Sequence, residues 1–176
     1  MSGAAPRHLV LVGLMGAGKT TVGAGCATRL DRPFVDTDDL VEVLAGRTVA
    51  ELFATGEQAF RDVERRAVAD ATTSPTPLVI ACGGGAVLDA ENRAALRARG
   101  FVVWLRADPA VLAERVRDDG VDRPLLAAGP LPTLVRLAET RDAAYGAVAD
   151  TQVSTEDRTP DAVVDAVVEE FTRCVA

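Results

Sequence analysis

A glycine-rich turn near the start of the chain has the residue types and spacing of a phosphate-binding loop. The segment 13–20 reads G-L-M-G-A-G-K-T and matches the pattern G-x-x-x-x-G-K-[ST]. In such loops the backbone N–H groups surround phosphate oxygens, and the following helix N-terminus adds the positive end of its dipole. We expect Lys19 to contact the β- and γ-phosphates and the Thr20 hydroxyl to be a ligand of Mg²⁺. The residues predicted to bind the triphosphate are Gly16, Ala17, Gly18, Lys19, Thr20 and Thr21.

Lys19 is the single lysine of the chain, and the remaining 18 of the 19 basic residues are arginines. A general preference for arginine explains most of this bias. Lys19 is the exception, and it stands at a position of the phosphate loop where a planar guanidinium cannot replace a compact ammonium group. A second lysine would be needed for the Asn-Lys-x-Asp motif of guanine-specific switch proteins, so ATP is the predicted nucleotide.

Two acidic residues follow a short predicted strand at 33–36. Because alternate residues of an extended strand point to the same face, Asp36 and Asp38 are expected to project together from its carboxyl end, where ligands bind in open α/β sheets. One carboxylate would serve the metal and the other an acceptor hydroxyl. The alternative is an acidic helix cap with a surface partner. The predicted strand at 78–81 ends in Cys82 and offers no carboxylate for a metal.

Several further residues are candidates for an acceptor site. Arg61 and Glu64 lie three residues apart on one helix face, which is also the pattern of a solvated ion pair. Three consecutive glycines, 83–85, favour a close approach of the backbone to a ligand over an ordinary loop.

Two more arginines stand in less informative contexts. Arg123 lies in a segment at 120–132 that is rich in glycine and proline. This arginine is either part of a mobile lid or a surface charge without a function. Arg141, followed by Tyr145 at helical spacing, is a weaker candidate still.

The elements that must position these residues alternate between short apolar runs and amphipathic stretches. This order predicts an α/β fold in three layers, with a parallel sheet covered by helices on both faces. The predicted strands are 8–12, 33–36, 78–81, 101–105 and about 152–153. The predicted helices are 19–30, 38–45, a short one from 48, 57–71, 89–99, one from Pro109, 131–148 and about 160–174.

Composition limits the possible functions. A length of 176 residues with 48% hydrophobic residues fits one domain, 1–176. A net charge of −7 argues against binding of nucleic acids or anionic membranes. Cysteines 26, 82 and 174 form no metal-ligand pair or disulfide framework, and His8 is the single histidine. With no predicted signal or membrane span, we expect a cytoplasmic protein.

Taken together, these motifs resemble those of the shikimate kinases over nearly the whole chain, from Leu9 to about Val168. The motifs that carry the resemblance are the phosphate loop 13–20, Asp36-Thr-Asp38, Gly56-Glu-x-x-Phe60-Arg61-x-x-Glu64, Gly83-Gly84-Gly85-Ala86, Arg123-Pro-Leu-Leu126 and Arg141-x-x-x-Tyr145.

The resemblance implies ATP:shikimate 3-phosphotransferase activity on a phosphate-loop, nucleoside-monophosphate-kinase-like fold with five parallel strands. It further implies a shikimate-binding region at about 36–64, a lid at about 117–131, Mg²⁺ with ATP as co-substrate, and a monomer whose partners are ATP and shikimate.

The resemblance also implies roles for single residues. Asp38 would bind the ring hydroxyls and accept or orient the reacting one. The carboxylate of shikimate would be held by Arg61 and Arg141, with Glu64 keeping Arg61 in place. Gly83, Gly84 and Gly85 would present backbone amides to the substrate, and Phe53 and Phe60 would wall the ring.

On the nucleotide side, the resemblance implies that Asp36 holds Mg²⁺ through water and that Arg123 reaches the transferring phosphate. For the arginine that stacks on adenine, Arg115 fits the usual spacing to Arg123 better, and Arg117 is a second candidate. Arg158 and Pro160 are expected to border the adenine.

Two other functions remain in view. The first is a related kinase for gluconate or a nucleoside monophosphate, which would not need the combination of Asp38, Arg61, the three glycines and Arg141. The second is a nucleotide-binding module without catalysis, which would have no need of Lys19, Asp38 and Arg123 together.

Overall fold

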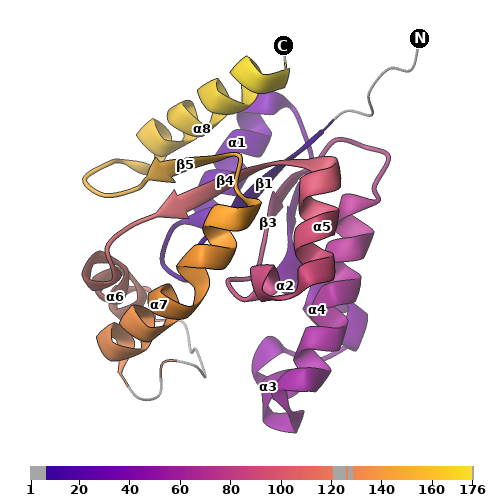
Figure 1. Cartoon of the computed structure of the whole chain (residues 1–176), viewed down its shortest axis with the longest axis vertical. Helices are drawn as coiled ribbons and strands as arrows, with labels where there is room; N and C mark the ends of the chain where they lie inside the picture. Colours follow the sequence, from indigo (N-terminus) through magenta and orange to yellow (C-terminus); the bar gives the residue numbers. More distant parts are fainter. Residues whose placement is uncertain (1–6, 121–125, 127–128, 176) are drawn as a thin grey trace.

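A parallel sheet of five strands forms the centre of the computed structural model, which describes residues 7–120, 126 and 129–175 (Figure 1). The strands follow the order β2-β3-β1-β4-β5, and each neighbouring pair is parallel. Their bounds are β1 His8–Val12, β2 Phe34–Asp36, β3 Val79–Ala81, β4 Gly100–Arg106 and β5 Thr151–Ser154. The predicted parallel sheet is therefore confirmed.

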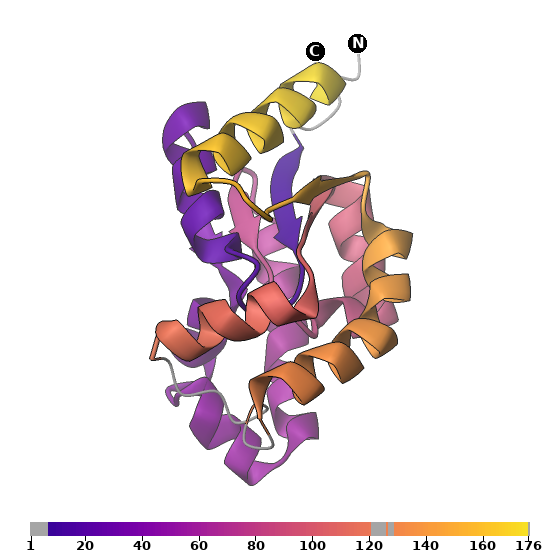
Figure 2. The same ribbon diagram turned by 90° about the vertical axis from the view of Figure 1, so that its left-hand side faces the viewer.

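Helices cover both faces of this sheet, as predicted. Helices α1 and α8 pack together on one face, α5 and α7 lie on the other with α4 beside α5, and α6 crosses the carboxyl end of the strands (Figures 1 and 2). The helix bounds are α1 Lys19–Leu30, α2 Thr37–Ala45, α3 Val49–Thr55, α4 Glu57–Thr72, α5 Ala90–Arg99, α6 Pro109–Asp118, α7 Pro130–Val148 and α8 Pro160–Val175. A 3₁₀ turn, η1 at Ala86–Leu88, is an addition that periodicity did not predict.

Most predicted boundaries are confirmed to within one or two residues because capping residues set them. Asp108 caps α6, whose first residue is Pro109, and its side chain accepts from the Ala110 N–H. Thr48 and Glu51 form the predicted capping box at the start of α3. Helix α6 continues to Asp118 and α7 begins at Pro130, so the two ends of the predicted lid at 117–131 are helical, while most of the segment between them lies outside the described residues.

The central strand positions the phosphate loop. All of β1 is buried, and β1 pairs with β3 on one side and β4 on the other, so its carboxyl end lies in the middle of the sheet. Gly13 follows directly with φ +147°, and a Cβ there would lie 2.4 Å from the carbonyl oxygen of Leu105. Only glycine lets the chain turn this close to β4.

His8, at the opposite end of β1, is a buried structural residue. Its Nδ1 accepts from the Leu78 N–H at 3.0 Å, which leaves Nε2–H to donate to the Thr72 carbonyl at 3.2 Å. Burial lowers the pKa of His8 below its usual value, and the positive charges of Arg32 and Arg99 add to this effect. The folded chain therefore holds the neutral ring, with both nitrogens in use.

This geometry predicts a loss of stability in weak acid. Since the pKa of His8 is depressed in the folded state, the unfolded chain takes up the proton first, and stability present above about pH 6.5 is lost as the pH falls. At about pH 5.5 the histidine contributes at most about 1.4 kcal/mol to this loss. Denaturant titrations of the original chain and of His8→Gln, each at about pH 5.5 and at a pH above about 6.5, measure this loss of stability. An equal pH dependence in the two proteins would contradict this role of His8.

Candidate active site

The phosphate loop is folded in the form that its glycines permit. Gly16 and Gly18 adopt φ +80° and +90°, and α1 begins at Lys19 directly after them. The ammonium group of Lys19 donates to the carbonyl oxygen of Leu14, on the other side of the loop, at 3.0 Å. The loop therefore presents a helix N-terminus and a half-buried cation at the same point.

A cavity of about 380 Å³ opens onto this loop. It is lined by Met15, Gly16, Gly18, Lys19, Thr20, Thr21, Asp36, Asp38, Cys82, Arg115 and Asp119. The fold thus brings the phosphate loop, the two predicted acids and one of the two predicted adenine arginines to one space at the carboxyl end of the sheet.

Asp36 and Asp38 reach this cavity by a different route from the predicted one. Asp36 ends β2 and caps α2, while Asp38 already lies in the first turn of that helix, so the argument from strand alternation was wrong. The Asp36 carboxylate accepts from the Asp38 N–H at 3.0 Å and from the Thr20 hydroxyl at 2.8 Å. The cap that was the alternative interpretation is therefore present, and it holds the carboxylate against the phosphate loop.

Burial changes the acidity of the two groups that face each other in the cavity. Desolvation raises the pKa of Asp38 to about 6, Asp36 adds to this effect, and Lys19 opposes it. Desolvation lowers the pKa of Lys19, while the charges of Asp38 and Asp36 counteract it. A carboxylate with a pKa of about 6 is suited to take a proton near neutral pH.

Arg61 and Glu64 form an ion pair near Asp38. The pair is largely buried, so the alternative of a solvated surface ion pair is wrong. The two side chains meet at 2.7 Å, and the side chain of Glu64 is only 1% exposed. One Glu64 oxygen, Oε1, and the Nε of the buried Arg141 have no hydrogen-bond partner among the residues that the structure describes. Unpaired polar atoms at this depth are unusual and indicate a place that a polar ligand completes.

The three glycines explain how these side chains come together. An added Cβ at Gly83 would lie 2.6 Å from Asp38 and 3.0 Å from Glu64, and one at Gly85 would lie 2.4 Å from Arg61. At Gly84 the nearest atom is Nη1 of Arg141, at 3.3 Å. Each glycine therefore makes room for a residue predicted to hold the acceptor.

The backbone amides of the triplet are not equivalent. The Gly83 N–H donates to the Thr37 hydroxyl at 2.8 Å, so the expectation that all three amides face the substrate is wrong for Gly83. Among the described residues, no protein acceptor takes the N–H of Gly84 or Gly85. Thr37, which sequence reasoning missed, lies between two predicted residues and orients the start of the triplet.

The two phenylalanines stack on each other, with ring centroids 4.4 Å apart. Phe60 is 4% exposed and supports the guanidinium of Arg61, whose Cζ lies 5.1 Å from the ring centre. Phe60 is therefore mainly a core residue beneath Arg61, whereas Phe53 is half-buried.

The predicted nucleotide arginines differ in their placement. Arg115 donates to the hydroxyl and the carbonyl of Thr155, at 2.9 and 2.8 Å, and lines the cavity of the phosphate loop. Arg117 is exposed and does not line it, and Arg158 is exposed and donates to the Ser154 carbonyl at 3.5 Å. Arg123 lies outside the described residues.

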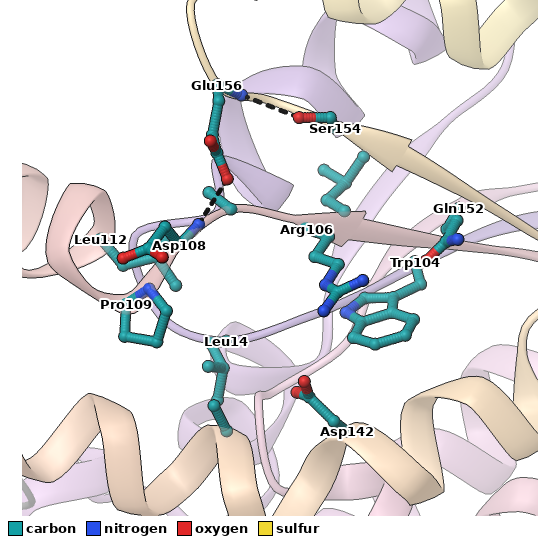
Figure 3. Close-up of a pocket in the computed structure, with 13 residues that line it drawn as sticks. Leu14, Trp104, Arg106, Asp108, Pro109, Leu112, Asp142, Gln152, Ser154 and Glu156 are labelled. Atoms are coloured by element: carbon teal, nitrogen blue, oxygen red, sulfur yellow. Dashed lines mark hydrogen bonds between the residues drawn. The ribbon is translucent and has the colours of Figure 1, made fainter.

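A second cavity of about 510 Å³ lies between α6, α7 and the carboxyl ends of β4 and β5 (Figure 3). Trp104 and Arg106 of β4 and Asp142 of α7 line it, with Arg106 stacked on the Trp104 ring at 5.2 Å. Leu14 is the one residue of the phosphate loop in its lining, and none of the predicted site residues reaches it. This second cavity is therefore separate from the candidate active site.

Comparisons with known proteins agree with this geometry. The family model described as shikimate kinase matches residues 15–172. A shikimate kinase of Symbiobacterium thermophilum is 50% identical over 167 residues, which cover 93% of this chain and 95% of the relative. One from Caulobacter vibrioides is 47% identical over 165 residues, which cover 92% and 80%.

Solved structures show the same likeness in three dimensions. A shikimate kinase from Acinetobacter baumannii in complex with shikimate superposes with a TM-score of 0.90 and 35% identity, over 96% of this chain and 94% of that one. A gluconokinase from Sinorhizobium meliloti has a TM-score of 0.70 at 21% identity, covers 98% and 95%, and shares the fold.

Proposed function

Because this chain belongs to the shikimate kinase family, which phosphorylates shikimate with ATP, we propose how its own residues divide that work. The reaction moves the γ-phosphate of ATP to the 3-hydroxyl of shikimate and leaves ADP. The observation that carries the assignment is the contact of one glycine triplet with Asp38, Arg61 and Arg141, next to the phosphate loop.

The nucleotide side consists of the loop amides and Lys19. Phosphoryl transfer has a loose transition state with negative charge on the equatorial oxygens, so positioning and positive charge supply most of the catalysis. Lys19 lines the cavity, and its ammonium group donates one of its three N–H bonds to the Leu14 carbonyl, which leaves two donors for phosphate oxygens. Arg115, the better placed of the two adenine candidates, would contact the base. Arg123 remains a prediction from the sequence.

The oxygen atoms of Thr20 and Asp36 fit the requirements of Mg²⁺. They lie 2.8 Å apart as a hydroxyl and a carboxylate, both hard ligands, beside the place of the phosphates. An ion held by these two residues would take its other ligands from phosphates and water. Bound there, Mg²⁺ would neutralise charge on the β- and γ-phosphates.

The acceptor side suits a hydroxylated ring acid. Arg61 and Arg141 supply guanidinium groups that bind a carboxylate in bidentate fashion, and the unpaired Nε of Arg141 is one free donor. Asp38 lies between this end and Lys19, so its carboxylate reaches the hydroxyl that faces the phosphate and takes its proton. Gly84 and Gly85 contribute their free N–H groups.

We also propose that the chain works as a monomer in the cytoplasm. The resemblance to the shikimate kinases supports the monomer, and the three cysteines, which are free thiols, fit a reducing compartment. Among the described helices none is long and apolar enough to cross a membrane.

The substrate is tested by ADP release from ATP with shikimate, gluconate or AMP as acceptor. We expect turnover with shikimate alone. Turnover with gluconate or AMP but not with shikimate would overturn the assignment, and ATP binding without transfer to any acceptor would indicate a non-catalytic module.

Arg61→Ala tests the carboxylate clamp, by which we mean the guanidinium groups of Arg61 and Arg141. Loss of a charge-assisted bidentate contact should raise the KM for shikimate by roughly 10- to 100-fold, while the KM for ATP stays close to its original value. Arg65→Ala is the matched control, since Arg65 follows on the same helix but pairs with Asp89 instead. An unchanged KM for shikimate in Arg61→Ala would remove Arg61 from the clamp.

A further inference from the structure

Tyr145 is a buried hydroxyl group that the proposed reaction does not yet use. It is the one tyrosine of the chain, it is completely buried on α7, and it lies one helical turn after Arg141. Its hydroxyl donates to the carbonyl oxygen of Gly84 at 2.5 Å. A phenol placed at this depth is normally paired, and here its partner belongs to the glycine triplet.

The same hydroxyl lies next to the second arginine of the clamp. A Cβ at Gly84 would be 3.3 Å from Nη1 of Arg141 and 3.7 Å from the Tyr145 oxygen, so both groups border one small space. Burial raises the pKa of Tyr145 well above its usual value, although the charge of Arg141 opposes this. Tyr145 therefore stays protonated and remains a hydrogen-bond donor to Gly84.

The bond to Gly84 has a consequence for the neighbouring amide. In a planar trans peptide the C=O of one residue and the N–H of the next point in opposite directions. Holding the Gly84 carbonyl at Tyr145 therefore sets the direction of the Gly85 N–H, which has no protein acceptor among the described residues. Gly85 lies against Arg61, so this amide is close to the first arginine of the clamp.

The ring of Tyr145 is held from behind. The indole of Trp104 packs on it with ring centroids 5.6 Å apart, and Trp104 also lines the second cavity (Figure 3). With the ring fixed by β4 and the hydroxyl fixed by Gly84, the phenol has little freedom to move away when Arg141 engages a ligand.

From these contacts we propose that Tyr145 is a positioning residue for the acceptor: its hydroxyl sets the Gly84–Gly85 peptide and the adjacent Arg141 in the geometry that binds the carboxylate of shikimate. The proposal rests on the proposed function. Tyr145 is expected to act on the affinity for the acceptor, because it is not among the residues that line the cavity of the phosphate loop.

The test is Tyr145→Phe, with dissociation constants for shikimate and for ATP measured separately by calorimetry. We expect the affinity for shikimate to fall about tenfold, the size of one hydrogen bond next to a charged group, and the affinity for ATP to change less than about twofold. Val148→Ala is the matched control: it removes buried volume from the same helix and should lower Tm without changing the affinity for shikimate.

An affinity for shikimate within twofold of the original in Tyr145→Phe would overturn the proposal. An equal loss in Val148→Ala would also overturn it, since the effect would then come from stability alone. If the original chain phosphorylates no shikimate, the proposed function fails instead, which the acceptor assay shows independently.

A second measurement needs no substitution of the core. Because Tyr145 is the single tyrosine, growth on 3-fluorotyrosine places one fluorine label at this site alone. Saturating shikimate should shift its ¹⁹F resonance. A resonance that stays unchanged, in a labelled protein that still turns over shikimate, would contradict the proposed link between Tyr145 and the acceptor.

Discussion

Replacing Asp38 by asparagine is expected to lower kcat for shikimate phosphorylation by about 10²- to 10⁴-fold, the range typical of a lost general base. The affinity for ATP should remain within about threefold, because Asp38 lies on the acceptor side of Lys19. The substitution keeps the shape of the side chain, and the bond that caps α2 uses the Asp38 N–H, which is unaffected. Steady-state turnover and ATP titration measure the two effects.

The pH dependence gives this prediction a second signature. Since the pKa of Asp38 is raised to about 6, its carboxylate is ionised above that pH and protonated below it. In the original chain, kcat/KM for shikimate should therefore fall as the pH drops through about 6, and this limb should be missing in Asp38→Asn.

Asp39→Asn is the matched control, because Asp39 is the next residue of α2 and is exposed outside the cavity. It should retain nearly full turnover. Near-normal turnover in Asp38→Asn, or an equal loss in both variants, would show that the acceptor base has been misplaced.

Substitution of Lys19 is the second large effect. Lys19→Met removes the ammonium group that donates to Leu14 inside the loop, and kcat should fall by at least about 10²- to 10³-fold, as when a preorganised charge donor is lost. The measurement is turnover at saturating ATP and shikimate, with the KM for ATP determined alongside.

Lys19→Arg separates charge from geometry. It restores the positive charge, but the guanidinium is planar and larger than the ammonium group that donates to Leu14 inside the loop. We therefore expect a loss close to that of Lys19→Met. Recovery of most activity in Lys19→Arg would mean that the single lysine of this arginine-rich chain reflects composition and has no geometric cause. Arg29→Lys, an exposed change at the far end of α1, should have no effect.

The elements and their limits were largely accessible from the sequence. The helix after the phosphate loop, 19–30, was predicted with its observed bounds, since a glycine before it and apolar spacing within it are local signals. The 3₁₀ turn at 86–88 was missed because three residues show no periodicity. The strand argument for Asp36 and Asp38 failed because a carboxylate that ends a strand can also cap the next helix.

The sequence predicted the candidate residues of the acceptor site one by one, but it could not predict which of them contact each other. Asp38, Arg61 and Arg141 lie on α2, α4 and α7, and periodicity does not show that all three meet the loop after β3. Thr37 and Tyr145 gave weaker signals still, because a hydroxyl that holds the backbone looks in the sequence like any other core residue.

Spacing over a few positions was enough to predict the phosphate loop, the alternation of strands and helices and most of the candidate site residues. Which of these residues come into contact depends on the packing of the whole chain. The strand order β2-β3-β1 places the ends of three strands from distant parts of the chain side by side, and this order arises from packing over the whole sheet. Whether Gly83 offers its amide to Thr37 or to a ligand, and whether Asp38 is buried enough to hold its proton near pH 6, follows from that packing alone.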